Sequence, residues 1–216
     1  MSDIDELVSI RKDILEASKG QDGFIDEQKI WDRVIVSTDD QEIEIKAQSR
    51  GYELHPRTAE LANDTASVKS VFNAVAQDLA LSPNDILWVF ALPVLYKNPI
   101  DFHQAKQIIE QESCKSLCGF IPAKTHPLYC WSFDENKKLL EQYIPNDVYR
   151  RQDLPPAFSP HNYLQCMKVE ELEFLNSEMI NRNTFPYFID AETANNIIEV
   201  DTPDELEIWK KLNNLS

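Results

Sequence analysis

The feature that most constrains this chain is an alternation of short apolar runs with amphipathic segments of about ten to fifteen residues. Apolar, β-branched runs occur in "RVIVSTDD", "DILWVFALPV" and "CKSLCGFIP", and segments with helical spacing separate them. Strands that alternate with helices in this way form a parallel sheet covered on both faces, because each parallel connection needs a crossover. The sequence therefore predicts an α/β fold with a doubly wound, mostly parallel sheet.

Local signals place several of these elements. Amphipathic spacing predicts a helix over residues 3–18, and a second helix over residues 41–50 is expected to stop at Gly51. Asn98 is a typical cap for a helix that begins at Pro99. The run "DILWVFALPV" is apolar throughout, which predicts a strand in the centre of the sheet.

The chain of 216 residues has the length of one domain, so we assign residues 1–216 to a single unit. Between residues 126 and 165 the alternation breaks, and this stretch is rich in aromatic residues, Pro and Asn, with a hairpin-like "FDENKK" turn. We interpret residues 126–165 as an inserted arm. Exposed aromatic side chains on an arm are typical of a subunit contact, and a large loop packed on its own core is the alternative.

The charge and composition exclude several functions. The formal net charge of -16 disfavours nucleic acid binding, which depends on basic residues that displace counterions. No apolar run approaches the roughly 20 residues needed to cross a bilayer, and the first residues lack the pattern of a signal peptide, so we expect a cytoplasmic protein without membrane contact. Only four glycines occur, which excludes a glycine-rich phosphate loop.

Two acids near the C-terminus are the strongest candidates for chemistry. In "ANNIIEVDTPDELEIW", Glu199 and Asp201 stand two positions apart on a predicted strand, so their carboxylates are expected on one face, where they can share a hard cation. Thr202 and Glu205 form a capping box for the next helix. The cap explains Thr202 and Glu205 without any function, but it does not explain the two acids before them.

Four motifs occur in an order that resembles one enzyme family. The segments "DRVIVSTDDQEI", "RTAELANDTAS", "RRQDLPPAF" and "VDTPDEL" resemble those of the acylneuraminate cytidylyltransferases, the CMP-sialic acid synthetases, from about Asp32 onward. The resemblance implies a fold of the nucleotide-diphospho-sugar transferase type, with an arm that crosses between the subunits of a homodimer. It also implies transfer of CMP from CTP to a nine-carbon sugar acid with Mg²⁺, with release of pyrophosphate.

The resemblance assigns roles to particular residues. Glu199 and Asp201 match the metal-binding, catalytic pair, with Glu in place of the first Asp. Arg151 matches an arginine that holds the sugar acid, and the resemblance implies substrate-binding roles for Arg57, Lys97 and His161, which stand at the following matched positions: Arg57 in "RTAELANDTAS", Lys97 in "ALPVLYK" and His161 in "HNYLQ".

The chain also departs from the family pattern. Residues 1–31 contain nothing similar to the family's first strand and phosphate loop, Ala91 replaces a glutamine that reads the base, and Tyr129 replaces a lysine. Three hypotheses follow: an active cytidylyltransferase with a remodelled nucleotide site, a non-catalytic homologue that keeps the fold and arm for binding or as a scaffold, and a subunit completed by another chain. The residues alone favour the second.

Overall fold

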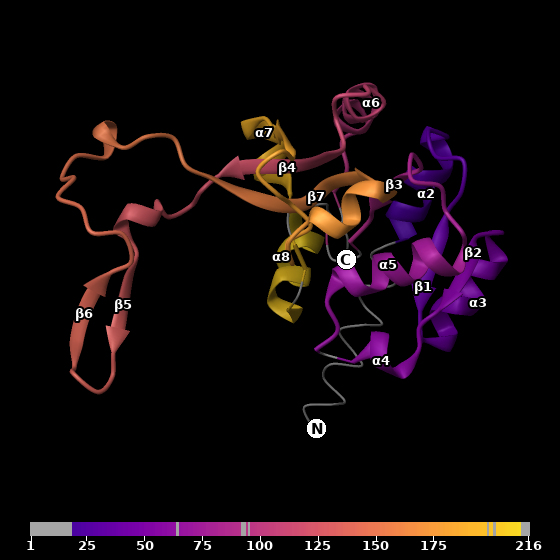
Figure 1. Cartoon of the computed structure of the whole chain (residues 1–216), viewed down its shortest axis with the longest axis horizontal. Helices are drawn as coiled ribbons and strands as arrows, with labels where there is room; N and C mark the ends of the chain where they lie inside the picture. Colours follow the sequence, from indigo (N-terminus) through magenta and orange to yellow (C-terminus); the bar gives the residue numbers. More distant parts are fainter. Residues whose placement is uncertain are drawn as a thin grey trace.

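The computed structural model describes residues 19–63, 65–91, 94, 96–197, 199–200 and 202–212. The helix predicted over residues 3–18 lies outside these ranges. The elements in chain order (Figure 1) are α2 (Lys19–Gln28), β1 (Ile35–Thr38), α3 (Gln41–Ser49), β2 (Glu53–Pro56), α4 (Ala59–Ala62), α5 (Val68–Asp78), β3 (Ile86–Val89), α6 (Pro99–Ile109), β4 (Ser116–Pro122), η1 (Pro127–Tyr129), β5 (Trp131–Asp134), β6 (Leu139–Gln142), η2 (Arg151–Asp153), β7 (Phe158–Lys168), η3 (Val169–Phe174), β8 (Phe185–Phe188), α7 (Ala191–Asn196) and α8 (Pro203–Leu212).

The main sheet has four strands in the order β3-β7-β4-β8. Strands β3 and β4 both run antiparallel to β7, and β8 runs parallel to β4, so three of the four strands share one direction. Strands β1 and β2 form a separate parallel pair. The predicted α/β class with a mostly parallel sheet is therefore confirmed.

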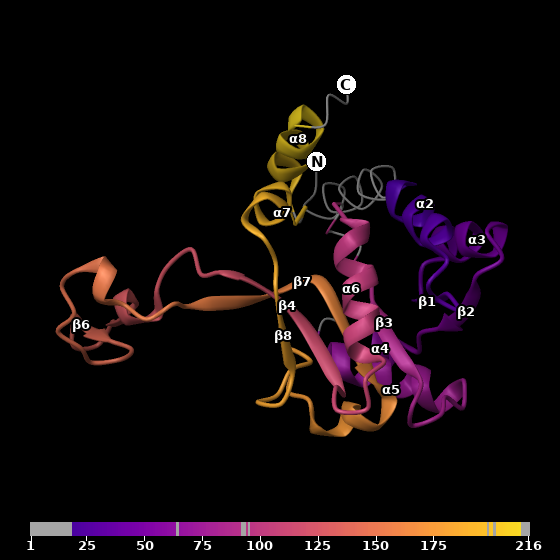
Figure 2. The ribbon, with the colours of Figure 1, turned by 90° about the horizontal axis from the view of Figure 1, so that it is seen from above.

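Helices cover both faces of the main sheet (Figure 2), and alternate residues of β3 belong to different cores. On one face, Trp88 packs with Phe102 of α6 in a cluster that includes Tyr163 and Cys166. On the other face, Leu87 and Val89 pack with a cluster formed by Met167 of β7 and residues of α5 and η3. The period of two along a strand produces this division, and it is the arrangement expected of a doubly wound sheet.

Strand β3 occupies an edge of its sheet, although its sequence predicted a central position. Among the described residues, its strand partner is β7 alone. Its apolar character has another cause, because cores cover both of its faces and aromatic side chains lie at its end. A run that is apolar throughout indicates a strand whose two faces are both buried. Burial of both faces does not require a neighbouring strand on each side.

Aromatic packing joins β3 to the β1–β2 unit. Among the described residues, no strand pairing links the two sheets. Trp31, just before β1, makes edge contacts with Trp88 and Phe90, at ring-centroid distances of 5.8 and 5.1 Å. Phe24 of α2 packs on Trp31 and on Phe102. These rings, together with Phe102 of α6, hold the two sheets in one structure.

The expected helix boundaries follow from caps. The Asp40 side chain accepts hydrogen bonds from the backbone of Glu42 and Ile43 at the start of α3, and Gly51 follows that helix with a positive φ of 75°, as predicted. Asn98 caps α6 by accepting from the Ile100 amide, with Pro99 in the first position.

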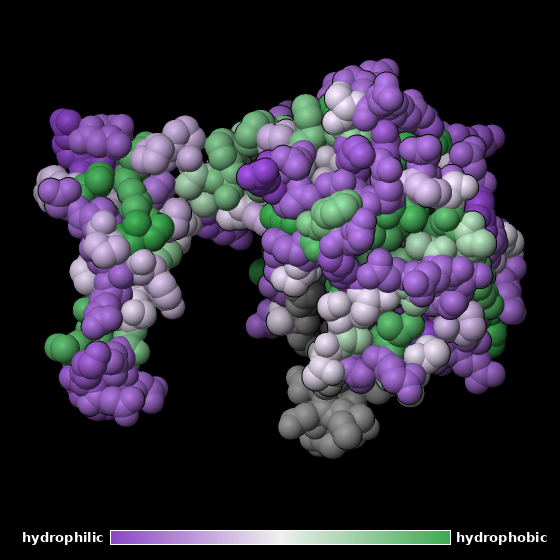
Figure 3. Space-filling view, viewed as in Figure 1, coloured by the Kyte–Doolittle hydropathy of each residue, from purple (hydrophilic) through white to green (hydrophobic). Residues whose placement is uncertain are grey.

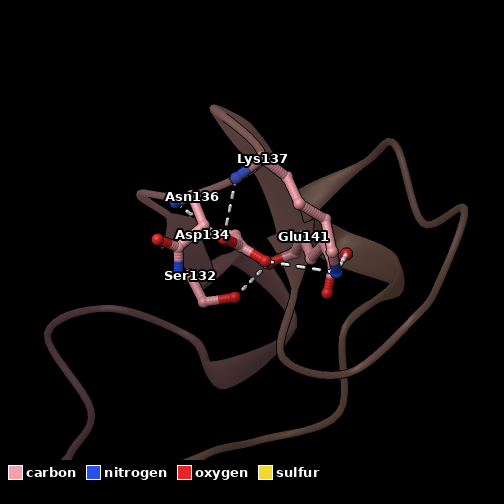
Figure 4. A network of polar contacts seen from close by, with 5 residues as sticks. All are labelled: Ser132, Asp134, Asn136, Lys137 and Glu141. Carbon is pink, nitrogen blue, oxygen red and sulfur yellow. Dashed lines mark hydrogen bonds and ion pairs between the residues drawn. The ribbon is translucent and has the colours of Figure 1, made fainter.

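Residues between β4 and β7 form an arm that projects from the body of the molecule (Figure 1). At its end, β5 and β6 pair as an antiparallel hairpin. Asp134 accepts from the backbone amides of Asn136 and Lys137 in the turn, and Lys137 lies 3.2 Å from the same carboxylate (Figure 4). The arm was predicted over residues 126–165, and the last part of that range, from Phe158, belongs to β7.

The arm exposes many large apolar side chains, and hydrophobic surface is visible along it in Figure 3. The chain buries little of this surface itself, so the arm is no loop packed on its own core. The residues concerned include Trp131, Phe133, Leu139, Leu140, Tyr143, Ile144 and Tyr149, with Tyr149 at 93% exposure.

The C-terminal region differs from the strand predicted there. Asp190 accepts from the amides of Glu192 and Thr193 and starts α7, which uses residues as far as Asn196. Beyond this helix, the described part of the predicted strand shows an isolated bridge between Glu199 and Val94. The capping box before α8 is confirmed by reciprocal bonds between Thr202 and Glu205.

Candidate functional site

Three of the predicted site residues lie beside the carboxyl end of β3. Lys97 belongs to the loop between β3 and α6, His161 lies in β7, and Glu199 is held beside that loop through its bridge to Val94. In open α/β sheets, ligands bind at this edge, where the strands end and loops of different origin meet. The structure thus brings together residues that are up to 102 positions apart in the sequence.

A large bulge in β7 shapes the floor of this region. Along β4, the partner changes from Gln165 opposite Cys118 to His161 opposite Gly119, so residues 162–164 have no residue opposite them. The amide of Tyr163 donates to His161 Nδ1 at 3.1 Å, which ties the bulge to the histidine ring. Bulges re-aim side chains next to functional sites, and this one directs Tyr163 into the core.

Tyr163 fixes the loop that carries Lys97. Its hydroxyl is completely buried, accepts from the Asn98 amide at 2.9 Å and donates to Asp101 Oδ2 at 2.6 Å. Tyr187 of β8 donates to the other oxygen of Asp101 at 2.8 Å. Burial, and then the bond to Asp101, raise the pKa of the Tyr163 hydroxyl well above its ordinary value, so this hydroxyl stays protonated and keeps its role as donor.

Lys97 is the most perturbed basic group of the site. Its Nζ donates to the Val94 carbonyl at 2.7 Å and lies 5.5 Å from the centre of the Tyr163 ring. Burial lowers the pKa of Lys97 to about 7, and the charge of Glu199 opposes this shift. A partly desolvated ammonium group has lost hydration, so an anionic ligand that replaces the lost water is favoured at this position.

Charges around His161 connect it to the same cluster. Burial lowers the pKa of the His161 ring, Glu199 acts in the opposite direction, and Lys97 and Lys124 lower this pKa further. Glu199 therefore lies close enough to act on both Lys97 and His161. We define Lys97, His161, Glu199 and Lys124 as the strand-end cluster, which carries more basic than acidic groups and suits an anion.

The metal prediction rests on residues that the structure describes only in part. Glu199 is described, whereas Asp201 lies outside the described residues. Within the described ranges, no group of three or more His, Cys, Asp or Glu side chains is arranged to hold a metal ion. Glu199 therefore offers one carboxylate beside a basic cluster.

The two predicted arginines lie elsewhere. Arg57 follows β2, where its Nε donates to the Ser37 hydroxyl at 3.2 Å. Arg151 lies in η2 on the arm, is exposed, and has no ion-pair partner among the described residues, whereas its neighbour Arg150 is paired with Asp153. Within one chain, the projecting arm does not bring Arg151 into the strand-end cluster.

Sequence reasoning missed several residues that shape the site. Tyr163 and Asp101 were not candidates, and neither was Lys124, because the bulge and the long-range hydrogen bonds have no local signal. His55, which lies within hydrogen-bond distance of Ser37, and Asp78, which lies within hydrogen-bond distance of His55, were missed for the same reason. The one available signal was Tyr163 itself, which follows His161 by two positions in the same strand.

Comparison with known proteins supports the fold. No protein-family model matches the chain. The structure is similar to that of a solved CMP:2-keto-3-deoxy-manno-octonic acid synthetase complexed with CTP, with a TM-score of 0.55 and 14% sequence identity, over 84% of this chain and 80% of the other. At this identity the likeness shows a common fold.

The likeness bears on the sequence expectations as follows. The expected nucleotide-sugar transferase type of fold is confirmed. Within the described residues, no helix combines the length and apolar character that a membrane span requires. All four cysteines are free thiols, and three of them, Cys114, Cys118 and Cys166, are buried.

Proposed function

We propose that this protein is a cytidylyltransferase that uses CTP to activate a nine-carbon sugar acid of the sialic, or nonulosonic, class. The observation that carries the proposal is the convergence of Lys97, His161 and Glu199 beside the carboxyl end of β3. This arrangement stands on a fold similar to that of a synthetase solved with CTP. In this reaction the anomeric hydroxyl of the sugar attacks the α-phosphorus of CTP, and pyrophosphate leaves.

Lys97 is suited to hold the phosphates of CTP. An anion that approaches the buried Nζ favours its charged form, so the bound lysine takes up a proton that is partly absent from the free protein near pH 7. His161 and Lys124 belong to the same cluster and are further candidate donors. In phosphoryl transfer, catalysis depends mainly on positioning and on stabilising negative charge, and a desolvated cation serves both purposes.

Magnesium fits this site as a partner of the nucleotide. Mg²⁺ is commonly held by one or two carboxylates together with substrate phosphates, and Glu199 supplies one such carboxylate. Asp201, which we propose as the second, lies outside the described residues. Magnesium bound there would neutralise charge on the phosphates of CTP.

The arm suggests how the sugar acid is held. Among the described residues, Arg151 has no ion-pair partner, and it lies on an arm that exposes a row of apolar side chains. In a homodimer the arm would cover its apolar side chains against the second copy and carry Arg151 to the partner's site, where it would pair with the sugar carboxylate. Arg57, whose two Nη groups have no acceptor among the described residues, is proposed as a further substrate contact.

Calorimetry with CTP and magnesium tests the nucleotide site. At pH 7.5 we expect binding with proton uptake, measured as a dependence of the heat on the ionisation enthalpy of the buffer. Lys97→Met should remove the proton uptake, and Lys46→Met, on an exposed position of α3, should leave it unchanged. No heat at millimolar CTP would refute the nucleotide site in the isolated chain.

Pyrophosphate release tests catalysis and the choice of sugar. The protein with CTP and magnesium is offered N-acetylneuraminic acid or 3-deoxy-manno-octulosonic acid, and release is expected with the nine-carbon acid. Arg151→Ala should lower the rate while CTP binding persists, and Arg150→Ala, whose side chain is already paired with Asp153, is the matched control. CTP binding without release with any sugar acid would support the non-catalytic alternative.

Light scattering tests the dimer. Deletion of residues 130–150 removes the hairpin and most of the exposed apolar side chains of the arm. We expect the mass to fall from that of a dimer to that of a monomer. An unchanged mass would show that the arm does not hold the subunits together.

A further inference from the structure

A serine, a histidine and an aspartate form a hydrogen-bonded row at the β1–β2 pair. Ser37 Oγ lies 3.0 Å from His55 Nδ1, and His55 Nε2 lies 3.0 Å from Asp78 Oδ2. Ser37 and His55 are register partners on the two parallel strands, and Asp78 is the last residue of α5. Three separate elements thus bring together a hydroxyl, an imidazole and a carboxylate.

Asp78 fixes the direction of the hydrogen bonds in this row, and the opposite end of the row is formed by Arg57. Its Nε donates to Ser37 Oγ at 3.2 Å, and a guanidinium group can only donate. At the other end, the Asp78 carboxylate accepts, which assigns the ring proton to His55 Nε2 and leaves a lone pair on Nδ1. The Ser37 proton therefore points to His55, and each group in the order Arg57, Ser37, His55, Asp78 donates to the next.

The surroundings suit a nucleophile. His55 is only 2% exposed, so its ring is held in one orientation, whereas Ser37 is partly exposed at the carboxyl end of β1. The nearby guanidinium of Arg57 favours negative charge on the Ser37 oxygen. Its two Nη groups have no acceptor among the described residues, so they are available to a ligand.

We propose that Ser37, His55 and Asp78 form a nucleophilic site that cleaves small carboxylic esters, with Arg57 as the donor that stabilises the oxyanion. Nucleophile, base and orienting carboxylate within hydrogen-bond reach define this kind of site by geometry, whatever the fold that carries it. The nucleophile, Ser37, and the base, His55, do not belong to the strand-end cluster. The chemistry of this site needs neither CTP nor a metal.

The reaction balances as follows. Ser37 Oγ attacks the ester carbonyl carbon while its proton passes to His55 Nδ1, and the carbonyl oxygen, now negative, accepts from the Arg57 Nη groups. The bond to the alcohol breaks, and His55 returns the proton to the departing alcohol oxygen. Water then attacks the acyl carbon, gives a proton to His55, and releases the carboxylic acid as Ser37 regains its hydrogen. Ester and water yield acid and alcohol.

A fluorophosphonate probe tests the nucleophile directly. In this labelling Ser37 Oγ bonds to phosphorus, fluoride leaves, and the proton passes to His55. The full chain is treated with the probe without CTP, and peptide mass spectrometry is expected to place the label on Ser37. Ser37→Ala should abolish the label, while Ser132→Ala, a serine on the arm hairpin, should change nothing.

Variants of the other two residues separate a catalytic row from a structural one. His55→Gln is expected to slow labelling of Ser37 at least about a hundredfold, as loss of a general base does. Because replacement of the buried His55 also removes packing, the exposed Asp78 provides the second test. Asp78→Asn should slow labelling about tenfold or more, and its melting temperature should stay within a few degrees of that of the parent chain. Hydrolysis of p-nitrophenyl acetate should fall in parallel.

Two outcomes would overturn the proposal. One is the absence of label on Ser37 in the folded protein, and the other is equal labelling rates in the parent and Asp78→Asn chains. Because CTP is absent throughout, neither result depends on the proposed cytidylyltransferase activity.

Discussion

Replacement of Tyr163 by phenylalanine removes a single oxygen from the centre of the site. That hydroxyl is completely buried, accepts from the Asn98 amide at 2.9 Å and donates to Asp101 Oδ2 at 2.6 Å. In the variant, the amide loses its acceptor and the buried carboxylate loses one of its two tyrosine donors. The ring itself remains, so the packing with Phe102 is retained.

The magnitude follows from these two losses. A buried group left without a partner costs about 1–3 kcal/mol, and a hydrogen bond to a carboxylate contributes about 1.5–3 kcal/mol. With partial relaxation we expect the free energy of unfolding to fall by about 3 kcal/mol. For a chain of this size, this corresponds to a decrease of about 6–12 °C in the melting temperature.

Urea unfolding followed by tryptophan fluorescence measures the effect, with Tyr187→Phe as the matched control. Tyr187 donates to the other oxygen of Asp101, but it is only partly buried, so water can replace its hydroxyl, and we expect a loss of about 1 kcal/mol. If Tyr163→Phe costs no more than Tyr187→Phe, the Tyr163 hydroxyl does not anchor the loop as described. CTP binding should weaken in Tyr163→Phe alone, because that loop carries Lys97.

Three further predictions concern the charge, the backbone and the aromatic packing of the site. Folding lowers the pKa of Lys97 from 10.5 to about 7, so between pH 7 and 9 the folded chain loses a proton that the unfolded chain keeps, and stability should rise by about 2 kcal/mol over this range. Lys97→Met should lack this rise in urea titrations at the two pH values, and a rise equal to that of the parent would contradict the pKa assignment. Gly119→Ala places a Cβ 3.0 Å from Ile189 Cδ1 and 3.3 Å from the Leu164 carbonyl, which should cost about 1–3 kcal/mol of unfolding free energy, and an unchanged urea midpoint would show that the bulge adjusts freely. Trp31→Ala removes the rings that join β3 to the β1–β2 unit and should cost about 3–5 kcal/mol in the same assay, and a loss below about 1 kcal/mol would mean that other contacts hold the two sheets together.

The boundaries of most elements could be predicted because their causes are local. Asn98 and Thr202 each satisfy backbone amides within a few residues of their own position, and the structure confirms both predicted caps, while Asp40 does the same at the start of α3. The apolar runs in the sequence also located β1, β3 and β4 correctly. Near the C-terminus, the Asp190 cap starts a helix that the sequence analysis did not predict, and the described residues after it form a bridge and not a full strand.

The site could be predicted only in part. Sequence reasoning selected Glu199 first from its spacing with Asp201, and Lys97 and His161 through a family resemblance, and the structure brings these three residues together. The same reasoning placed Arg151 on the inserted arm, but only the structure shows that the arm projects away from the body, because the direction of the arm is set by the ends of β4 and β7.

The sequence by itself determined which segments are helical, which are extended and where caps end them, since these choices depend on neighbours within a few positions. Only the tertiary structure decided the place of β3 at a sheet edge, the bulge that buries Tyr163, and the row from Arg57 through Ser37 and His55 to Asp78. These features arise from contacts between residues 18 to 65 or more positions apart, whose energies depend on burial and distance in the folded chain.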